Sequence, residues 1–174
     1  YFNNILTFNR NLKPYRGPSY DKVHTGLDAY NEHPLSTDYW YKGNRPDDYA
    51  SHKLPVYIGS NLYYNKALPF NREKFSLESR TYSPLIYIER EGDKLFLNLE
   101  IDNSFKEMNT KIITTKLLGT AFQSEAAFEN NDSSPLSVDV DINGQNRNNI
   151  NPTVGPFEKL KKGKNRIKIF TFNH

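Results

Sequence analysis

The sequence predicts an all-β fold built from the terminal rungs of a right-handed parallel β-helix, with a long irregular loop and an antiparallel C-terminal cap. Three observations predict it. Short apolar strands are bracketed by Asn in the first half, Asn is unusually abundant with 21 residues, and alternating apolar strands separated by Gly turns fill the second half. Asn tolerates left-handed backbone and bonds its own neighbours, so many Asn indicate many turns and short elements. A β-sandwich is the alternative architecture.

The Asn-bracketed strands are the evidence for the β-helix. Residues 4–9 read Asn, four mainly apolar residues and Asn, and residues 61–65 repeat the pattern with three residues between. Successive coils of a parallel β-helix have this appearance, because each short strand stacks on the previous one and Asn occupies the corners. Residues 1–82 are therefore predicted to form rungs, interrupted by a Pro- and Gly-rich loop over residues 13–54.

Residues 83–174 are predicted to form the antiparallel cap. A strand over 85–88, a turn at 91–93 and an alternating strand over 95–101 read as a hairpin. Further strands are expected over 111–118, over 136–142 before the Asn143-Gly144 turn, and over 164–170.

Composition limits the partners and the compartment. The net charge of +3 is too balanced to predict nucleic-acid binding, and no apolar stretch is long enough to predict a membrane span. The absence of Cys excludes disulfides and thiolate metal sites. The chain starts inside an apolar pattern and without Met, which predicts a fragment or processed product. Without a targeting signal in the chain, both an extracellular and a cytoplasmic bacterial location stay open.

The long loop carries the candidate substrate-binding residues. Sugars are bound by flat aromatic faces together with carboxylates and Arg that bond hydroxyl groups. The residues of these types that we select are His24, Asp28, Tyr39, Trp40, Tyr41 and Arg45. The alternative is that the aromatic residues pack the loop onto the strands beneath it.

No catalytic residue, cofactor or metal site is predicted. Asp47 and Asp48 follow a Pro and suit the first turn of a helix, where acidic side chains complement the helix dipole. Residues 139–144 match the first half of a calcium loop, but Ile150 stands where the bidentate Glu is required. The His residues are too irregularly spaced to indicate zinc, and the basic run over 159–164 reads as a solvated turn.

Two groups of segments carry a resemblance to a known family. They are residues 1–6 (YFNNIL) and 58–65 (IGSNLYYN), and residues 128–136 (FENNDSSPL) continuing through Asp139, Asp141, Gly144 and Arg147 to 151–157 (NPTVGPF). The chain resembles the C-terminal part of right-handed parallel β-helix glycoside hydrolases, and most closely the β-xylosidases of glycoside hydrolase family 120. The resemblance implies retaining hydrolysis of xylosides by an Asp nucleophile and a Glu acid/base, both upstream of this segment, so neither is assigned here.

The sequence therefore predicts the C-terminal portion of an enzyme that hydrolyses β-xylosides or related plant polysaccharide fragments. Its expected partners are an oligosaccharide or polysaccharide and the remainder of the same enzyme chain, and a homo-oligomer stays open. Other functions also fit the pattern: a non-catalytic carbohydrate-binding module, a β-helix polysaccharide lyase, or a purely structural β-helix segment.

Overall fold

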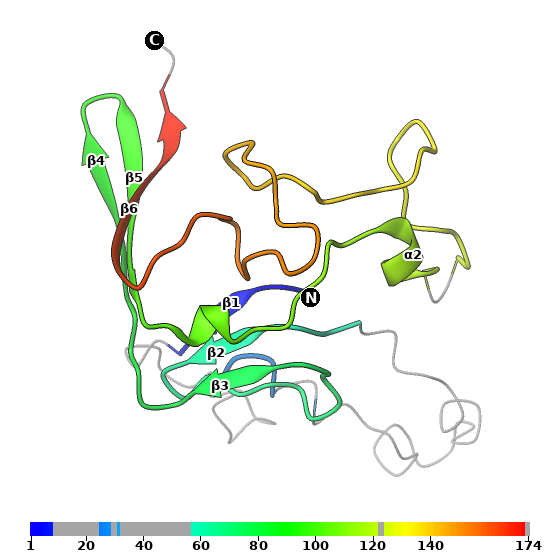
Figure 1. The fold of residues 1–174 in the computed structure, drawn as a ribbon, viewed down its shortest axis with the longest axis horizontal. Coiled ribbons are helices and arrows are strands. Elements are labelled where there is room, and N and C mark those ends of the chain that lie inside the picture. Colours follow the sequence, from blue (N-terminus) through cyan, green and yellow to red (C-terminus); the bar gives the residue numbers. More distant parts are fainter. Residues whose placement is uncertain (9–24, 29–30, 32–56, 122–123, 173–174) are drawn as a thin grey trace, which may run out of the picture.

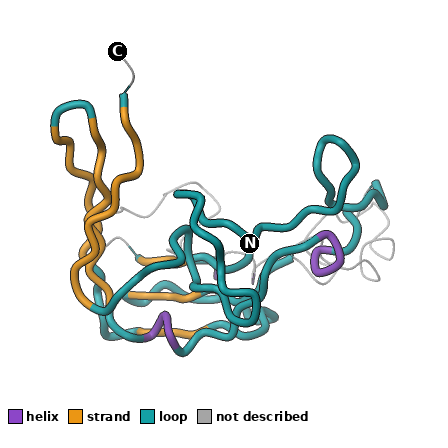
Figure 2. Tube along the Cα trace, turned by 45° about the horizontal axis from the view of Figure 1, so that its top comes forward, coloured by secondary structure: helices purple, strands orange, loops and turns teal. Residues whose placement is uncertain are grey.

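The computed structural model describes residues 1–8, 25–28, 31, 57–121 and 124–172. These residues form two three-stranded sheets, one parallel and one antiparallel. In Figure 1 the parallel sheet lies in the body of the molecule, whereas the antiparallel sheet projects from it as an arm. Figure 2 shows that loops and turns connect these sheets and that helices are few and short. The predicted all-β fold class is confirmed.

The parallel sheet has very short strands in consecutive order: β1 (Ile5–Thr7), β2 (Leu62–Tyr64) and β3 (Leu77–Ser79). Its register aligns Ile5 with Leu62, and Leu62 with Leu77. Such a stack of three-residue parallel strands is the arrangement that the Asn-bracketed segments predict.

A left-handed residue precedes each of these strands by two positions. Asn3, Ser60 and Phe75 have φ of 55°, 57° and 63°. The strand register places them at equivalent positions of the three rungs, and parallel bridges join the residues just before them. The chain thus makes the same corner three times. The expected bend at Asn4 and Asn61 lies one residue earlier, at Asn3 and Ser60.

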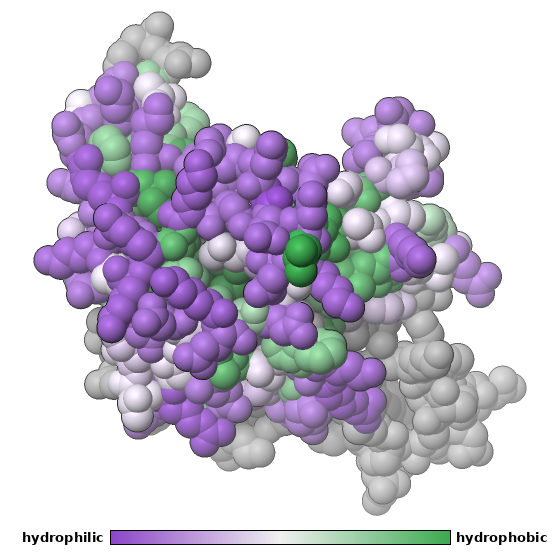
Figure 3. Space-filling view, in the orientation of Figure 1, coloured by the Kyte–Doolittle hydropathy of each residue, from purple (hydrophilic) through white to green (hydrophobic). Residues whose placement is uncertain are grey.

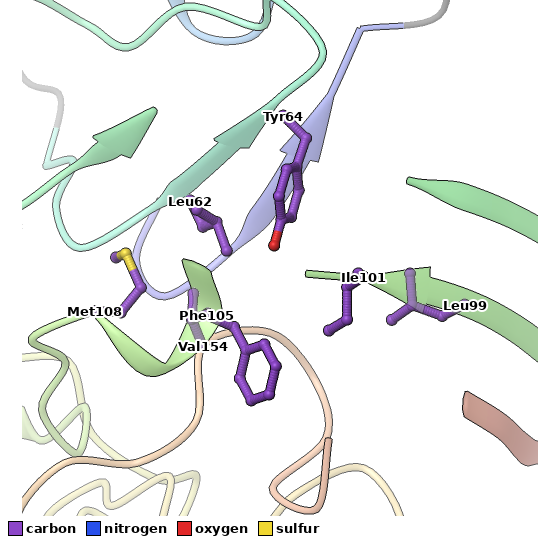
Figure 4. Packing of buried hydrophobic residues seen from close by; sticks show 7 residues of the cluster. All are labelled: Leu62, Tyr64, Leu99, Ile101, Phe105, Met108 and Val154. Carbon is purple, nitrogen blue, oxygen red and sulfur yellow. The ribbon is translucent and has the colours of Figure 1, made fainter. Parts of the chain in front are cut away.

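Both faces of β2 are buried. One face contributes Leu62 and Tyr64 to the larger hydrophobic cluster, and the other contributes Tyr63 to a second cluster. Figure 4 shows the larger cluster, in which residues from β2 meet residues from the antiparallel sheet and from two later segments. Its buried members are Leu62, Tyr64, Leu99, Ile101, Phe105, Met108 and Val154. One hydrophobic core therefore joins the two sheets.

The antiparallel sheet comprises β4 (Leu85–Glu91), β5 (Lys94–Ile101) and β6 (Gly163–Thr171), with β5 in the centre. A turn at Gly92, with φ of 60°, joins β4 to β5. The predicted hairpin and the predicted final strand are both confirmed.

Two predicted strands are wrong. Residues 115–118 form the helical turn α2 (Thr115–Leu118), where Thr114 accepts a hydrogen bond from the backbone N–H of Leu117 at 3.2 Å. Residues 136–142 form isolated bridges and no ladder. Val138, Val140 and Ile142 are exposed there, so the alternating apolar side chains do not form the buried face of a sheet. The Asn143-Gly144 turn does form, with Gly144 donating to the Asp141 carbonyl at 2.9 Å.

The division into rungs over 1–82 and a cap over 83–174 stays a prediction. None of the helices in the described part of the chain has the length and apolar composition needed to cross a bilayer.

Candidate functional site

The predicted loop is fastened to the parallel sheet through residues 25–28. The backbone of Leu27 donates to Leu68 at 2.9 Å, and Leu68 donates back to Thr25 at 2.9 Å. The Thr25 hydroxyl also donates to the carbonyl of Lys66 at 3.0 Å. Leu27 is buried in the cluster that contains Tyr63. This contact brings part of the loop to the segment that directly follows β2.

Gly26 permits this close approach. Its φ is 74°, and an added Cβ would lie 2.6 Å from the backbone oxygen of Leu68. A side chain at this position would therefore push the two segments apart, and left-handed backbone would strain it further. Glycine is required for the loop to dock here.

Asp28 is the one predicted sugar-binding residue that lies within the described residues. Its Oδ1 accepts a hydrogen bond from the backbone N–H of Thr25 at 2.7 Å, so the carboxylate closes the turn that carries it. Nearby, Asn31 Oδ1 accepts from the backbone N–H of Asn71 at 2.7 Å. The other predicted residues, namely His24, Tyr39, Trp40, Tyr41 and Arg45, lie outside the described residues.

A second carboxylate, Glu73, lies in the connection between β2 and β3. Its Oε1 accepts from the backbone N–H and the Nδ2 of Asn61 at 2.9 and 2.8 Å, and its Oε2 accepts from the hydroxyl of Tyr63 at 2.5 Å. Both donor residues are completely buried. Glu73 is therefore held in a fixed position by the corner and the strand of one rung.

Asn61 connects this carboxylate to the preceding rung. Its Oδ1 accepts from the backbone N–H and the Nδ2 of Asn4 at 2.8 and 2.9 Å, and its Nδ2 reaches the carbonyl of Tyr1 at 3.2 Å. The register stacks Asn4 on Asn61. The Asn residues that the sequence places at the corners thus tie neighbouring rungs together.

The hydroxyl of Tyr63, which bonds Glu73, is neutral. Burial of Tyr63 raises the pKa of its hydroxyl well above the usual value, and the hydrogen bond to Glu73 raises that pKa further. The Tyr63 hydroxyl consequently stays protonated and donates its proton to the hydrogen bond with Glu73. A carboxylate held by a neutral phenol and an amide can accept further hydrogen bonds from a ligand hydroxyl.

The opposite face of β2 carries a related arrangement. The hydroxyl of Tyr64 donates to Asp102 Oδ1 at 2.8 Å, and the Ser79 hydroxyl donates to Oδ2 at 3.1 Å. Burial works against the charged form of Asp102, but these donors and the backbone N–H of Ser104 outweigh it and lower its pKa. This carboxylate joins β2, β3 and the end of β5.

The segment that resembles a calcium loop has another role. The carboxylate of Asp141 accepts backbone hydrogen bonds from Asn143 and Gln145 at 2.8 and 2.9 Å, and from Glu158 at 2.9 Å. Its oxygens are thus engaged by the chain. Within the described ranges, His, Asp and Glu side chains do not gather in threes that could hold a metal ion.

Sequence reasoning did not select Glu73 or Asp102. Both are isolated acidic residues in the sequence, and their donors come from elsewhere in the fold. The repeated Asn-bracketed pattern could have pointed to Glu73. The connection after β2 has to return to the start of the next rung, and this return brings its residues close to Asn61.

Comparison with known proteins gives one informative match. No family model and no curated protein matches the chain. Among solved structures, XylC in complex with xylose is similar, with 30% sequence identity and a TM-score of 0.72. The match covers 97% of this chain and 26% of the XylC chain. Nearly all of this chain thus has a counterpart in XylC, and the fold is related, but the chain spans only about a quarter of XylC's length.

Proposed function

We propose that this chain is the C-terminal portion of a carbohydrate-active enzyme that hydrolyses β-xylosides or related plant polysaccharide fragments. The similarity to a xylose-bound protein over 97% of the chain carries the proposal. The resemblance of residues 58–65 and 128–157 to the β-xylosidases of glycoside hydrolase family 120 supports the same substrate class.

The sugar is proposed to bind on the side of the parallel sheet where residues 25–28 are docked. Asp28 belongs to the docked segment, which contacts residues 66–68. Glu73 lies a few residues further along that same connection between β2 and β3. Both carboxylates are held by hydrogen bonds. Fixed carboxylates bind sugar hydroxyls with little loss of conformational freedom. The aromatic run from Tyr39 to Tyr41 belongs to the same loop and would provide the stacking surface.

The catalytic carboxylates are proposed to lie outside this chain. A retaining glycosidase needs two carboxyl groups about 5–5.5 Å apart, one of which can protonate the leaving group. Asp102 and Asp141 do not suit the general-acid role, because neighbouring donors lower the pKa of both and keep them ionised. This portion would then contribute sugar contacts and the closing structure.

The test uses the natural gene product that contains this chain. Hydrolysis of p-nitrophenyl β-xyloside should be detectable, and calorimetry should show binding of xylose or xylobiose. Trp40→Ala and Asp28→Asn should weaken binding at least tenfold. Tyr87→Ala, which removes an exposed aromatic residue on the antiparallel sheet, serves as the matched control and should leave binding unchanged.

Each outcome separates the alternatives. Binding without hydrolysis would favour a non-catalytic carbohydrate-binding module. Release of unsaturated products that absorb near 235 nm from polyuronate would favour a lyase. Absence of binding to every sugar tested would leave a structural role and overturn the proposal.

A further inference from the structure

The basic residues of this chain are concentrated just before β6 and along it. Residues 159–168 contain six of the 23 basic residues and none of the 20 acidic ones, so this segment has a charge of +6 and the rest of the chain −3. All six residues are exposed, and together we call them the basic surface: Lys159, Lys161, Lys162, Lys164, Arg166 and Lys168. In Figure 3 most of the visible surface of the arm is purple, the colour of hydrophilic residues.

Most charges of the basic surface have no acidic partner among the described residues. Arg166 pairs with Glu89 and Glu91. Lys159 donates to the side-chain oxygen of Gln145, a neutral group, at 2.9 Å. Within the described part of the chain, no carboxylate forms an ion pair with the other four side chains, which are Lys161, Lys162, Lys164 and Lys168. These four charges are therefore open to an anion from outside.

The backbone that carries the basic surface is held in place by Asn165. This residue is buried, and its Nδ2 donates to the carbonyls of Lys161 and Gly163 at 2.8 and 3.0 Å, and to that of Leu99 in β5 at 3.2 Å. Its Oδ1 accepts from the backbone N–H of Lys161 at 3.0 Å. The turn with Lys161 and Lys162 is thus fixed to the antiparallel sheet. A surface of fixed shape loses less conformational freedom when it binds a partner.

Along β6 the charges lie in a row on one face of the sheet. Lys164, Arg166 and Lys168 occupy alternate positions, so their side chains leave the same face at intervals of about 6.6–6.8 Å. The ladder with β5 runs without a shift from Gly163 to Lys168, which keeps this row regular. Glu100 stands opposite Lys164 in the register, yet the two form no ion pair in the described structure.

Protection of a sheet edge explains only part of this arrangement. Strand β6 is an edge strand, and positive charges on an edge strand discourage pairing with another chain. This accounts for Lys164 and Lys168. Lys161 and Lys162 precede the strand, so they have no ladder edge to protect. Their fixed and unpaired charges indicate a binding surface that extends from the strand onto the turn before it.

We propose that the basic surface binds a polysaccharide that carries uronic acid groups. Carboxylates that recur along a polymer complement cations that recur along a strand and its preceding turn. The choice of a polysaccharide rests on the proposed function, because the similarity to a xylose-bound protein favours a carbohydrate over other polyanions. The basic surface holds the charged groups of the polymer and raises its concentration near the enzyme.

Other polyanions fit this surface less well. Single-stranded nucleic acids stack their bases on aromatic side chains, and residues 159–168 contain no aromatic residue. Phe96, on the same face of the sheet, has its ring covered by the Arg166 guanidinium, 3.6 Å from the centroid. Basic clusters that bind anionic lipids lie beside membrane spans or on amphipathic helices, whereas this one lies on a strand and a turn.

Binding of glucuronoxylan to the natural gene product tests the proposal. Glucuronoxylan should bind more tightly than the same polysaccharide with its carboxyl groups reduced to alcohols, and added NaCl should diminish the difference, because salt screens exposed charges. The double variant Lys162→Gln/Lys164→Gln should bind it about fivefold more weakly at low salt, since each exposed charge pair contributes little. The matched control is Lys111→Gln/Lys116→Gln, which removes the same charge from exposed residues in α2 and the segment before it.

The outcomes separate this inference from the proposed function. Equal binding of the two polysaccharides, or equal losses in the two double variants, would overturn the inference, as would tighter binding of double-stranded DNA or of phosphatidylserine vesicles at the same salt concentration. Hydrolysis of p-nitrophenyl β-xyloside, a neutral substrate, should be the same in both variants. Binding of glucuronoxylan without any hydrolysis would refute the proposed function alone, and hydrolysis without a preference for carboxyl groups would refute this inference alone.

Discussion

The two sheets of this molecule differ in strand length and in burial. The fully buried strand is one of the short ones, and the fully exposed strand is one of the long ones. Strands of the parallel sheet have three residues, and β2 is completely buried. Strands of the antiparallel sheet have seven to nine residues, and β4 is exposed along its whole length. Parallel strands depend on cover over both faces, whereas an antiparallel ribbon is stabilised by its own local ladder. Substitutions should therefore have much larger effects in β2 than in β4.

The largest effect is expected for Leu62→Ala in β2. Leu62 is fully buried in the cluster that joins the two sheets, so the substitution leaves a cavity. We expect a loss of about 2–5 kcal/mol in the free energy of unfolding, measured by urea denaturation. Ile88→Ala in β4 is the control and should change it by less than about 0.5 kcal/mol. Similar losses for both variants would show that β4 is covered in solution.

The next effect concerns the corner residue Asn61. Asn61→Ala removes the acceptor for Asn4 and the Nδ2 donor to Glu73, and it leaves partly buried polar groups without these partners. The backbone donor of residue 61 persists, so we expect a loss of about 2–3 kcal/mol by denaturation. Asn98→Ala on β5, where the amide donates to the exposed Glu89, should have little effect. A small loss for Asn61→Ala would mean that the corner amides do not hold the rungs together.

A pH-dependent effect is expected from Asp141. Burial opposes ionisation of this carboxylate, but backbone N–H donors and the nearby Arg147 lower its pKa below the ordinary 3.8. Because the folded-state pKa is depressed, the stabilisation is complete above about pH 5 and is lost as the pH falls through the folded-state pKa. Asp141→Asn should therefore destabilise the protein at pH 7 and flatten the fall of stability on acidification. An unchanged acid profile would contradict this role.

The smallest effect is expected for Arg166→Ala on the antiparallel arm. Its guanidinium lies over the ring of Phe96, 3.6 Å from the centroid, and pairs with Glu89 and Glu91. These groups are exposed, and exposed ion pairs stabilise little. A small decrease in Tm is expected, and most of it should disappear in about 1 M NaCl, where charges are screened. A large decrease that is insensitive to salt would place this face in a buried contact.

The elements that the sequence predicts correctly are those with local signals. The hairpin around Gly92 and the last strand combine clear alternation with a Gly turn, and each has a partner strand nearby or a strong pattern of its own. The Asn-bracketed segments predict β1 and β2, because Asn favours turns and stands directly beside these short apolar strands. The sequence does not predict the third strand, β3. The position equivalent to Asn4 and Asn61 is Ser76 there, so the Asn that marks the other two strands is missing.

Long-range contacts account for what the sequence does not predict. Residues 136–142 alternate as a strand does, but their pairing is limited to isolated bridges, one with Thr114 and one with Asn146. The fixing of Glu73 depends on Asn61 and Tyr63, whose side chains only the fold brings to it. Asp28, one of the predicted sugar-binding residues, accepts a hydrogen bond from the backbone N–H of Thr25. The sequence analysis did not predict this local contact.

The three left-handed corners have a consequence for how this protein can change. Asn3 and Ser60 are 57 positions apart, whereas Ser60 and Phe75 are 15 apart, yet all three occupy equivalent places in the stack. The scaffold therefore fixes where a coil starts but not how much chain it contains. The connection between Phe8 and Tyr57 can lengthen, shorten or be exchanged between relatives, provided that a Gly and a short turn remain to fasten it. The length of chain between two corners can in this way change while the corners themselves stay in register.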